Sequence, residues 1–129
     1  MVDPVSLSMA LFAALLAVVG QMLLKIAMSK VGIIGLVTLT NPSELIWLLL
    51  IQPLLWIAAG VYAIGFLIWL VVLSRIPLSV AYPTLATTYI FIPMASALLL
   101  GETINSRQWV GMVFIVVGVI LVSVLSANK

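Results

Sequence analysis

The residues with the clearest chemical potential are Gln21 and Lys25, which lie four residues apart in an otherwise apolar stretch, with Gly20 beside them. In a helix this spacing places both side chains on one face. A lysine in or near the hydrocarbon of a membrane usually faces a bundle interior or a wet cavity. We therefore expect Lys25 to be a cationic anchor for an anionic head group, with Gln21 adding hydrogen bonds. The alternative is that Lys25 only extends its ammonium from the helix end to the interface.

A second polar cluster lies in residues 81–93, "AYPTLATTYIFIP", which contain two prolines, two tyrosines and three threonines. Pro83 and Pro93 each remove a backbone donor and leave a carbonyl one turn earlier without its helical partner. In the structural interpretation, neighbouring threonine hydroxyls satisfy these carbonyls. In the functional interpretation, the helix bends at the prolines to open and close a polar groove, since irregular backbone at membrane depth is tolerated beside a cavity. The groove would be lined by Tyr82, Thr87, Thr88 and Tyr89.

The composition determines which elements hold these residues. Of the 129 residues, 66% are hydrophobic and 6% are charged, whereas a soluble domain is about a quarter charged. Four uncharged stretches each reach the roughly 20 residues that cross a hydrocarbon core about 30 Å thick, and in lipid each should be helical. They are Val5–Leu24, Leu45–Ser74, Ile76–Gly101 and Gln108–Asn128. We predict an all-α integral membrane protein, a single domain formed by a bundle of four transmembrane helices.

The expected helices cover residues 5–28, 45–73, 77–100 and 107–126, each bound being approximate. Pro53 is a natural break, so residues 44–52 are either an interfacial turn or a tilted extension of the second span. Residues 31–44 form the only loop of any length. Ser106 or Asn105 should cap the last helix.

The residue types exclude several classes of function. The chain has no cysteine and no histidine, so thiol chemistry and the commonest metal ligand and general base are absent. No phosphate-binding or dinucleotide-binding glycine motif occurs. We expect neither an enzyme nor a metal or cofactor site. A net charge of +2, from five basic and three acidic residues, gives no sign of a nucleic-acid partner.

The basic residues give only a weak indication of orientation. With four crossings, Arg75 and Lys129 lie on the side of the termini, and Lys25, Lys30 and Arg107 lie on the other side. A bias of three to two is small for the rule that basic residues stay inside. Either the cellular context selects one orientation, or the chain inserts both ways and two copies pair antiparallel.

The last helix contains a candidate dimer interface. Gly111 and Gly118 are seven residues apart, so they lie on one side of the helix and allow another helix to approach closely. The alternative is that they pack against helices of the same chain. Four helices are too few to surround a sizeable substrate, so we expect a dimer, formed with an identical or a related four-helix chain.

Three segments carry a family resemblance: "VVGQMLLKIA" (18–27), "WLVVLSRIPLSVAYPTLATTYIF" (69–91) and "GETINSRQWVGMVFIVVGVILV" (101–122). Their patterns G-Q-x-x-x-K, I-P-x-x-x-A-Y-P and R-x-W-x-G resemble the small four-helix, EamA-like members of the drug/metabolite transporter superfamily. The resemblance covers most of the chain except residues 29–52. It is greatest to the paired subunits thought to flip aminoarabinose-phosphoundecaprenol across the bacterial inner membrane.

This resemblance implies a flippase in the bacterial inner membrane that moves a polyprenyl phosphate, or its glycosylated form, between leaflets. Lys25 would pair with the phosphate and Gln21 would assist it. Arg75 and Arg107 would attract head groups at the two membrane surfaces. The sugar hydroxyls would be received by Tyr82, Thr87, Thr88 and Tyr89. The competing hypothesis is an accessory membrane subunit that stabilises a partner without moving a substrate.

The small multidrug resistance exporters are similar in the third helix and in the G-x6-G of the last helix, which makes an exporter of small molecules a third hypothesis. Those exporters carry a membrane-embedded glutamate in the first helix, and alignment on Gly20 places Ala17 there. The three acidic residues, Asp3, Glu44 and Glu102, are all expected at the edges of spans. Because a proton-coupled carrier needs a titrating group in its pathway, this pattern argues against exchange of drug for protons.

Overall fold

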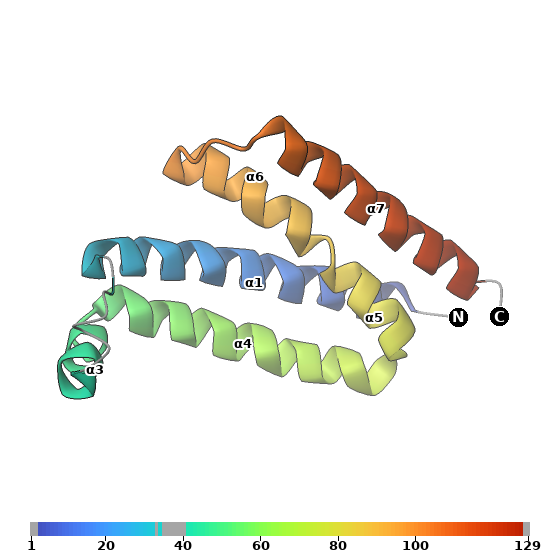
Figure 1. Ribbon diagram of the computed structural model, residues 1–129. Coiled ribbons are helices and arrows are strands. Elements are labelled where there is room, and N and C mark those ends of the chain that lie inside the picture. Colours follow the sequence, from blue (N-terminus) through green and yellow to red (C-terminus); the bar gives the residue numbers. More distant parts are fainter. Residues whose placement is uncertain (1–2, 33, 35–40, 128–129) are drawn as a thin grey trace.

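The computed structural model describes the backbone of residues 3–32, 34 and 41–127, and side chains as far as Leu121. These residues form helices and no strand, so the all-α fold is confirmed (Figure 1). The centre of the predicted loop at 31–44, and Lys129, lie outside the described residues. The helices are α1 (Pro4–Val31), α3 (Pro42–Leu50), α4 (Pro53–Arg75), α5 (Leu78–Leu85), α6 (Thr88–Leu100) and α7 (Ser106–Ala127).

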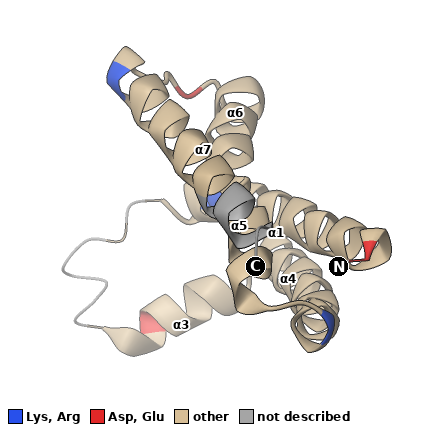
Figure 2. Cartoon of the chain, turned by 90° about the vertical axis from the view of Figure 1, so that its right-hand side faces the viewer, with Lys and Arg blue, Asp and Glu red and all other residues tan. Residues whose placement is uncertain are grey.

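Three segments of the described chain are long and apolar enough to cross a membrane: Pro4–Val31, Pro53–Arg75 and Leu78–Leu100. The part of α7 with described side chains, Ser106–Leu121, is apolar but shorter, so a fourth crossing stays a prediction. Figure 2 shows the charged residues of the described chain at or near helix ends and in the connection between α6 and α7. This distribution leaves long uncharged helix surfaces for contact with lipid.

Local chemistry explains where α1 begins and ends and where α4 begins. The side chain of Asp3 accepts the backbone N–H of Ser6 at 3.1 Å, as a residue at a helix N-terminus commonly does. The helix ends at Gly32, whose positive φ of 88° favours glycine and whose N–H bonds the carbonyl of Met28 at 3.0 Å. Pro53 is the first residue of α4, so the predicted break at this proline is confirmed and α3 is a separate helix.

The most extensive helix contact is between α1 and α4, which run antiparallel along their length (Figure 1). Small residues allow this close approach. A Cβ added to Gly20 would lie 2.8 Å from Cε2 of Tyr62, and one added to Gly65 would lie 3.3 Å from Cβ of Leu16. The small buried residues of α1 are Ser6, Ala10, Ala13, Ala14, Gly20 and Ala27, and those of α4 are Ala58 and Gly65.

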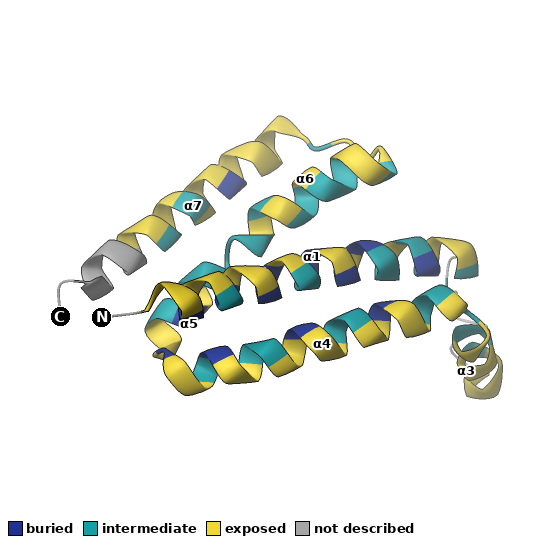
Figure 3. Ribbon diagram, turned by 180° about the vertical axis from the view of Figure 1, so that it is seen from behind, coloured by how far each residue is buried: buried dark blue, intermediate teal, exposed yellow. Residues whose placement is uncertain are grey.

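The pair is extended by α5 at the end where α1 begins. Ala10, Val72 and Ala81, from α1, α4 and α5, are fully buried there with Ile76. The described part of α7 is exposed along most of its length, with Met112 as its buried hydrophobic residue, whereas α6 is mostly half-buried and has no buried residue (Figure 3). The chain therefore combines a core formed by α1, α4 and α5 with two further helices, α6 against α1 and α7 against α5, which contribute little to that core.

The expected helix over 77–100 is divided in the structure, where α5 ends at Leu85 and α6 begins at Thr88. The N–H groups of Thr87 and Tyr89 donate to carbonyls three residues earlier, at 3.3 and 3.1 Å. The backbone therefore forms one turn with the tighter hydrogen-bond spacing of a 3₁₀-helix. The break lies between Pro83 and Pro93 rather than at either proline.

Candidate functional site

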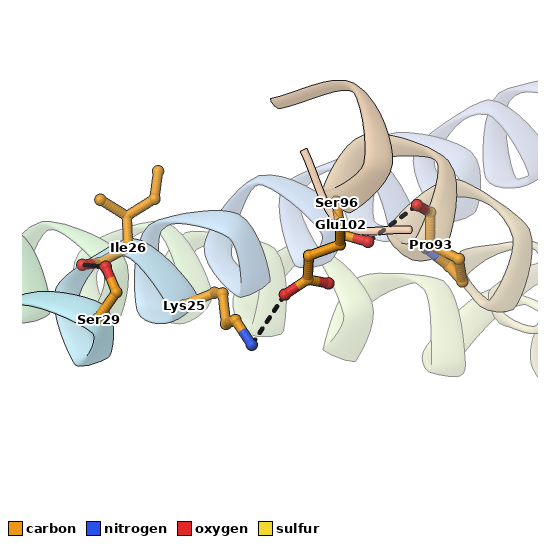
Figure 4. A network of polar contacts seen from close by, with 6 residues as sticks. All are labelled: Lys25, Ile26, Ser29, Pro93, Ser96 and Glu102. Carbon is orange, nitrogen blue, oxygen red and sulfur yellow. Dashed lines mark hydrogen bonds and ion pairs between the residues drawn. The ribbon is translucent and has the colours of Figure 1, made fainter. Parts of the chain in front are cut away.

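An ion pair joins α1 to the connection between α6 and α7. Nζ of Lys25 lies 2.9 Å from Oε1 of Glu102, with the two side chains 59% and 44% exposed (Figure 4). Glu102 follows Gly101, whose positive φ of 67° ends α6 in the left-handed conformation. Its backbone N–H bonds the carbonyl of Ser96 at 3.4 Å. The reversal of the chain at Gly101 thus presents the carboxylate to the first helix.

The environment of Glu102 favours its ionised form. The hydrogen bond from Lys25 is the largest cause that lowers the pKa of Glu102 below its ordinary value, followed by a hydrogen bond from Ser96 and the charge of Lys25. Hydrogen bonds to a carboxylate and a nearby cation both stabilise the charged form. The carboxylate is therefore the counter-ion of the Lys25 ammonium in this structure.

The ion pair lies in a cavity of about 420 Å³ between α1, α6, the α6–α7 connection and α7. A site of this volume lies within the range of about 300–1,000 Å³ that is typical of small-molecule pockets. Its polar residues are Gln21, Lys25, Ser96, Glu102, Thr103 and Gln108, and its apolar residues are Met22, Ile92, Pro93, Ile104 and Met112. The cavity can hold a charged and hydroxylated head group beside an apolar wall.

The start of α7 fixes one side of this cavity. Asn105 caps the helix, because its Oδ1 accepts the N–H of Arg107 at 3.2 Å, so the predicted cap by Asn105 is confirmed. In return, Oε1 of Gln108 accepts the N–H of Asn105 at 2.7 Å, which is the reciprocal pattern of a capping box. Gln108 thus both orders the connection and lines the cavity.

Lys25 lies toward the C-terminal end of α1. Lys25 lies six residues before the end of α1, which corresponds to about 9 Å of helix. Its ammonium meets the connection that joins α6 to α7, and such a connection lies near a membrane surface rather than at mid-depth. The ion pair therefore lies toward the end of the bundle at which α1 and α6 both end (Figure 1).

Of the residues predicted from the sequence, the structure brings Gln21, Lys25 and Pro93 together in this cavity. Tyr82 lies elsewhere, with its ring edge-on to that of Trp69 at a centroid distance of 6.1 Å and an angle of 86°. Six other predicted residues are also absent from the cavity lining among the described residues: Arg75, Pro83, Thr87, Thr88, Tyr89 and Arg107.

The threonine hydroxyls are bonded within their own segment of chain. Thr84 donates to the carbonyl of Val80 at 3.0 Å, and Thr87 donates to that of Thr84 at 2.7 Å. Thr88 donates to the carbonyl of Leu85 at 2.8 Å. The hydroxyls are thus bonded locally, as the structural interpretation expects, but their acceptors are not the carbonyls four residues before Pro83 and Pro93. Sugar binding by Thr87 and Thr88 stays a prediction.

The two arginines lie at opposite ends of the bundle. Arg75 is the last residue of α4 and adds a small part to the lowering of the pKa of Asp3, whose main cause is the hydrogen bond from Ser6. Arg107 is the second residue of α7, beside the connection that carries Glu102. Both side chains are exposed, and their attraction for head groups stays a prediction.

The glycines of α7 and the position of Ala17 complete the placement of the sequence candidates. A Cβ added to Gly111 or Gly118 would meet no atom within 4 Å, so neither glycine packs against another described helix of this chain.

Ala17 lines a second cavity of about 150 Å³ with mostly apolar walls, next to Tyr62 and Trp69. Among the residues lining that cavity, none is acidic.

Sequence reasoning missed the central partner, Glu102, and assigned no ligand role to Ser96 or Gln108. Glu102 was expected at the edge of a span, and it does lie in a connection, but its carboxylate reaches the cavity. The available signal was topological. In a four-crossing chain the end of the first helix and the end of the third lie on the same side, and this relation could have placed Glu102 on the side of Lys25.

Comparison with known proteins identifies the family. The model of the EamA-like transporter family matches residues 5–124. The chain belongs to the EamA-like transporter family. This membership, together with three helices of membrane-spanning length, makes the EamA-like chain a multi-pass protein of the bacterial inner membrane.

Curated relatives of this EamA-like chain are named as probable 4-amino-4-deoxy-L-arabinose-phosphoundecaprenol flippase subunits ArnE. The protein of Serratia proteamaculans (strain 568) is 38% identical over 71 residues, which are 54% of this chain and 62% of the relative. That of Yersinia pseudotuberculosis serotype O:1b (strain IP 31758) is 39% identical over 70 residues, 53% of this chain and 61% of the relative. The protein of Pseudomonas fluorescens (strain Pf0-1) is 36% identical over 70 residues, which are 54% of this chain and 61% of the relative.

The match thus spans about three fifths of the length of these curated relatives. No solved structure matches the chain.

Proposed function

We propose that the chain acts in a flippase that binds a polyprenyl phosphate, free or glycosylated, and moves its head group between the leaflets of the inner membrane. The observation that carries the proposal is the placement of Lys25 and Gln21 together in a cavity of about 420 Å³. The similarity to proteins named as phosphoundecaprenol-linked sugar flippase subunits supports the same lipid class.

Lys25 supplies the binding energy for the phosphate. A hydrogen bond between an ammonium and a phosphate oxygen is charge-assisted and roughly twice as strong as one between neutral groups. Gln21 lines the same cavity and adds neutral hydrogen bonds. The polyprenyl tail needs no enclosure, because lipid already solvates it. A small bundle can therefore serve a large lipid.

The divided third segment provides the movement. α5 belongs to the packed body with α1 and α4, whereas α6 forms a wall of the cavity through Ile92, Pro93 and Ser96. We assign the hinge to the tightened turn between these helices, with Pro83 and Pro93 weakening the hydrogen-bond ladder on either side. Rotation of α6 about this turn would open the cavity toward one leaflet or the other.

A second candidate is a non-transporting subunit of a heteromeric flippase. The observation that favours it is the word "subunit" in the names of the similar proteins. In this case the chain would still bind the lipid phosphate at Lys25 but would move it only with a partner chain.

Translocation of a labelled undecaprenyl phosphate in proteoliposomes tests the proposal. We expect Lys25→Met to lower the translocation rate by about tenfold or more, since a hydrogen bond to a charged group is worth about 1.5–3 kcal/mol. Lys30→Met is the matched control, because Lys30 is on the same helix but does not line the cavity. Equal rates for both variants and the unaltered chain would contradict the role of Lys25. Lipid binding without translocation would favour the subunit.

A further inference from the structure

We infer that Glu102 determines which head groups the cavity accepts, by favouring those that carry a free amine besides the phosphate. This inference rests on the proposed function and adds a role for a residue outside the predicted site. In the ligand-free structure Glu102 is the partner of Lys25 at 2.9 Å. A bound phosphate and Glu102 compete for the same ammonium.

The charge balance of the cavity carries the argument. Among the described residues that line it, Lys25 and Glu102 are the charged ones, so their formal charges cancel. A phosphate that binds Lys25 without bringing a cation leaves the carboxylate unpaired and close to a second negative charge. Two neighbouring negative charges repel each other, which destabilises both the ionised carboxylate and the bound phosphate. A head group with an ammonium and a phosphate replaces each member of the ion pair with an equivalent partner.

The position of Glu102 allows the ion pair to exchange its partners for ligand groups. Glu102 is on a connection, its side chain is 44% exposed, and it is hydrogen-bonded to Ser96 of α6 through its backbone N–H at 3.4 Å and through its carboxylate. Lys25 is on α1, which packs along the length of α4. Because both side chains are largely exposed, each can exchange its partner for a ligand group without a rearrangement of the helices.

The neutral polar residues lie on the same cavity surface. Gln21 on α1, Ser96 on α6 and Gln108 on α7 all line the cavity with the ion pair. They provide hydrogen-bonding groups from three helices for the hydroxyls of a sugar between its phosphate and its amine. The predicted ligand class is therefore a lipid-linked aminosugar phosphate whose amine is not acylated.

Binding titrations with three lipids test the inference: undecaprenyl phosphate, an aminosugar phosphoundecaprenol, and the same glycolipid with its amine acetylated. We expect the unaltered protein to bind the free-amine glycolipid about tenfold more tightly than the acetylated one. Glu102→Gln should bring this ratio close to one by weakening the first and strengthening the second. Glu102→Asp should preserve the preference, because it keeps the carboxylate. Glu44→Gln is the control, since Glu44 lies on α3 and does not line the cavity.

The outcomes separate this inference from the proposed function. If both glycolipids bind equally to the unaltered protein and to Glu102→Gln, and all binding still requires Lys25, the role of Glu102 is wrong and the proposed function stands. If none of the three lipids binds to the folded protein, both are wrong. Correct folding of each variant is checked by its melting temperature in detergent.

Discussion

Lys25 and Glu102 differ in the backbone that carries them. Lys25 extends from a helix that packs along α4, whereas Glu102 sits on the short connection that begins at Gly101. Both side chains are largely exposed, so the ammonium is accessible to a ligand phosphate and the carboxylate to a ligand amine. At the scale of residues, the site is an ion pair that must break when a ligand phosphate binds Lys25.

The pH dependence of this pair follows from the lowered pKa of Glu102. The hydrogen bond from Lys25 is the main cause. The other polar residues that line the cavity carry no charge: Gln21, Ser96, Thr103 and Gln108. A carboxylate with a lowered pKa keeps its stabilising contact above its ordinary pKa and loses it as the pH falls through the lowered value.

Carbon-13 NMR of the Glu102 carboxyl group during an acid titration measures this directly. We expect Lys25→Met to raise the midpoint of the titration, because it removes the largest cause of the lowering. Lys30→Met should leave the midpoint where it is. An unchanged midpoint in Lys25→Met would mean that the ion pair does not form in solution.

At the scale of elements, the α1–α4 contact makes the body against which α6 can move. The close approach depends on Gly65, where an added Cβ would lie 3.3 Å from Cβ of Leu16 and 3.8 Å from the carbonyl of Ala13. Gly60 lies on the same helix, but an added Cβ there would meet nothing within 4 Å. The two glycines form a matched pair for testing the contact.

We expect Gly65→Leu to destabilise the fold by about 1–3 kcal/mol, the usual cost of overpacking, and Gly60→Leu to have little effect. Thermal unfolding of each variant in the same detergent measures the difference. Equal melting temperatures for the two variants would show that α1 and α4 are not in close contact along this surface.

The sequence predicted elements well where the decisive interaction is local. Pro53 marks the start of α4 and Asn105 caps α7, because a missing donor or a capping side chain acts within one turn. The α1 surface that packs on α4 was not recognised. Partner-facing and lipid-facing residues are both apolar in a membrane, so hydrophobic periodicity does not distinguish them.

The same reasoning explains which site residues were found. Gln21 and Lys25 are polar in an apolar helix, and this contrast is visible in the sequence alone. Glu102 becomes part of the site only because α1 and α6 end on the same side of the molecule, which is a tertiary relation. Tyr82 is equally conspicuous in the sequence, yet its ring packs against Trp69 instead of facing the cavity.

At the scale of the whole molecule, α6 and α7 present apolar surfaces that the chain itself does not cover. Leu98 on α6 is 81% exposed and Phe114 on α7 is 72% exposed. In the inner membrane such surfaces contact lipid or another helix. Gly111 and Gly118 leave one side of α7 open to close approach, as the predicted dimer requires.

A double variant, Gly111→Leu with Gly118→Leu, tests that prediction. Because an added Cβ at either position meets no atom of the described chain, the substitutions should not disturb the fold of a single chain. We expect them to shift the protein from dimer to monomer, as measured by its mass in detergent, with an unchanged melting temperature. Persistence of the dimer would place its interface elsewhere.

The central claim is that Lys25 binds the phosphate of a polyprenyl lipid, and native mass spectrometry of the protein extracted gently from its own membranes tests it most directly. The account predicts a bound mass equal to a polyprenyl phosphate or its glycosylated form. It also predicts that this mass is lost in Lys25→Met and retained in Lys30→Met. A folded Lys25→Met variant that still carries the same lipid would contradict the account.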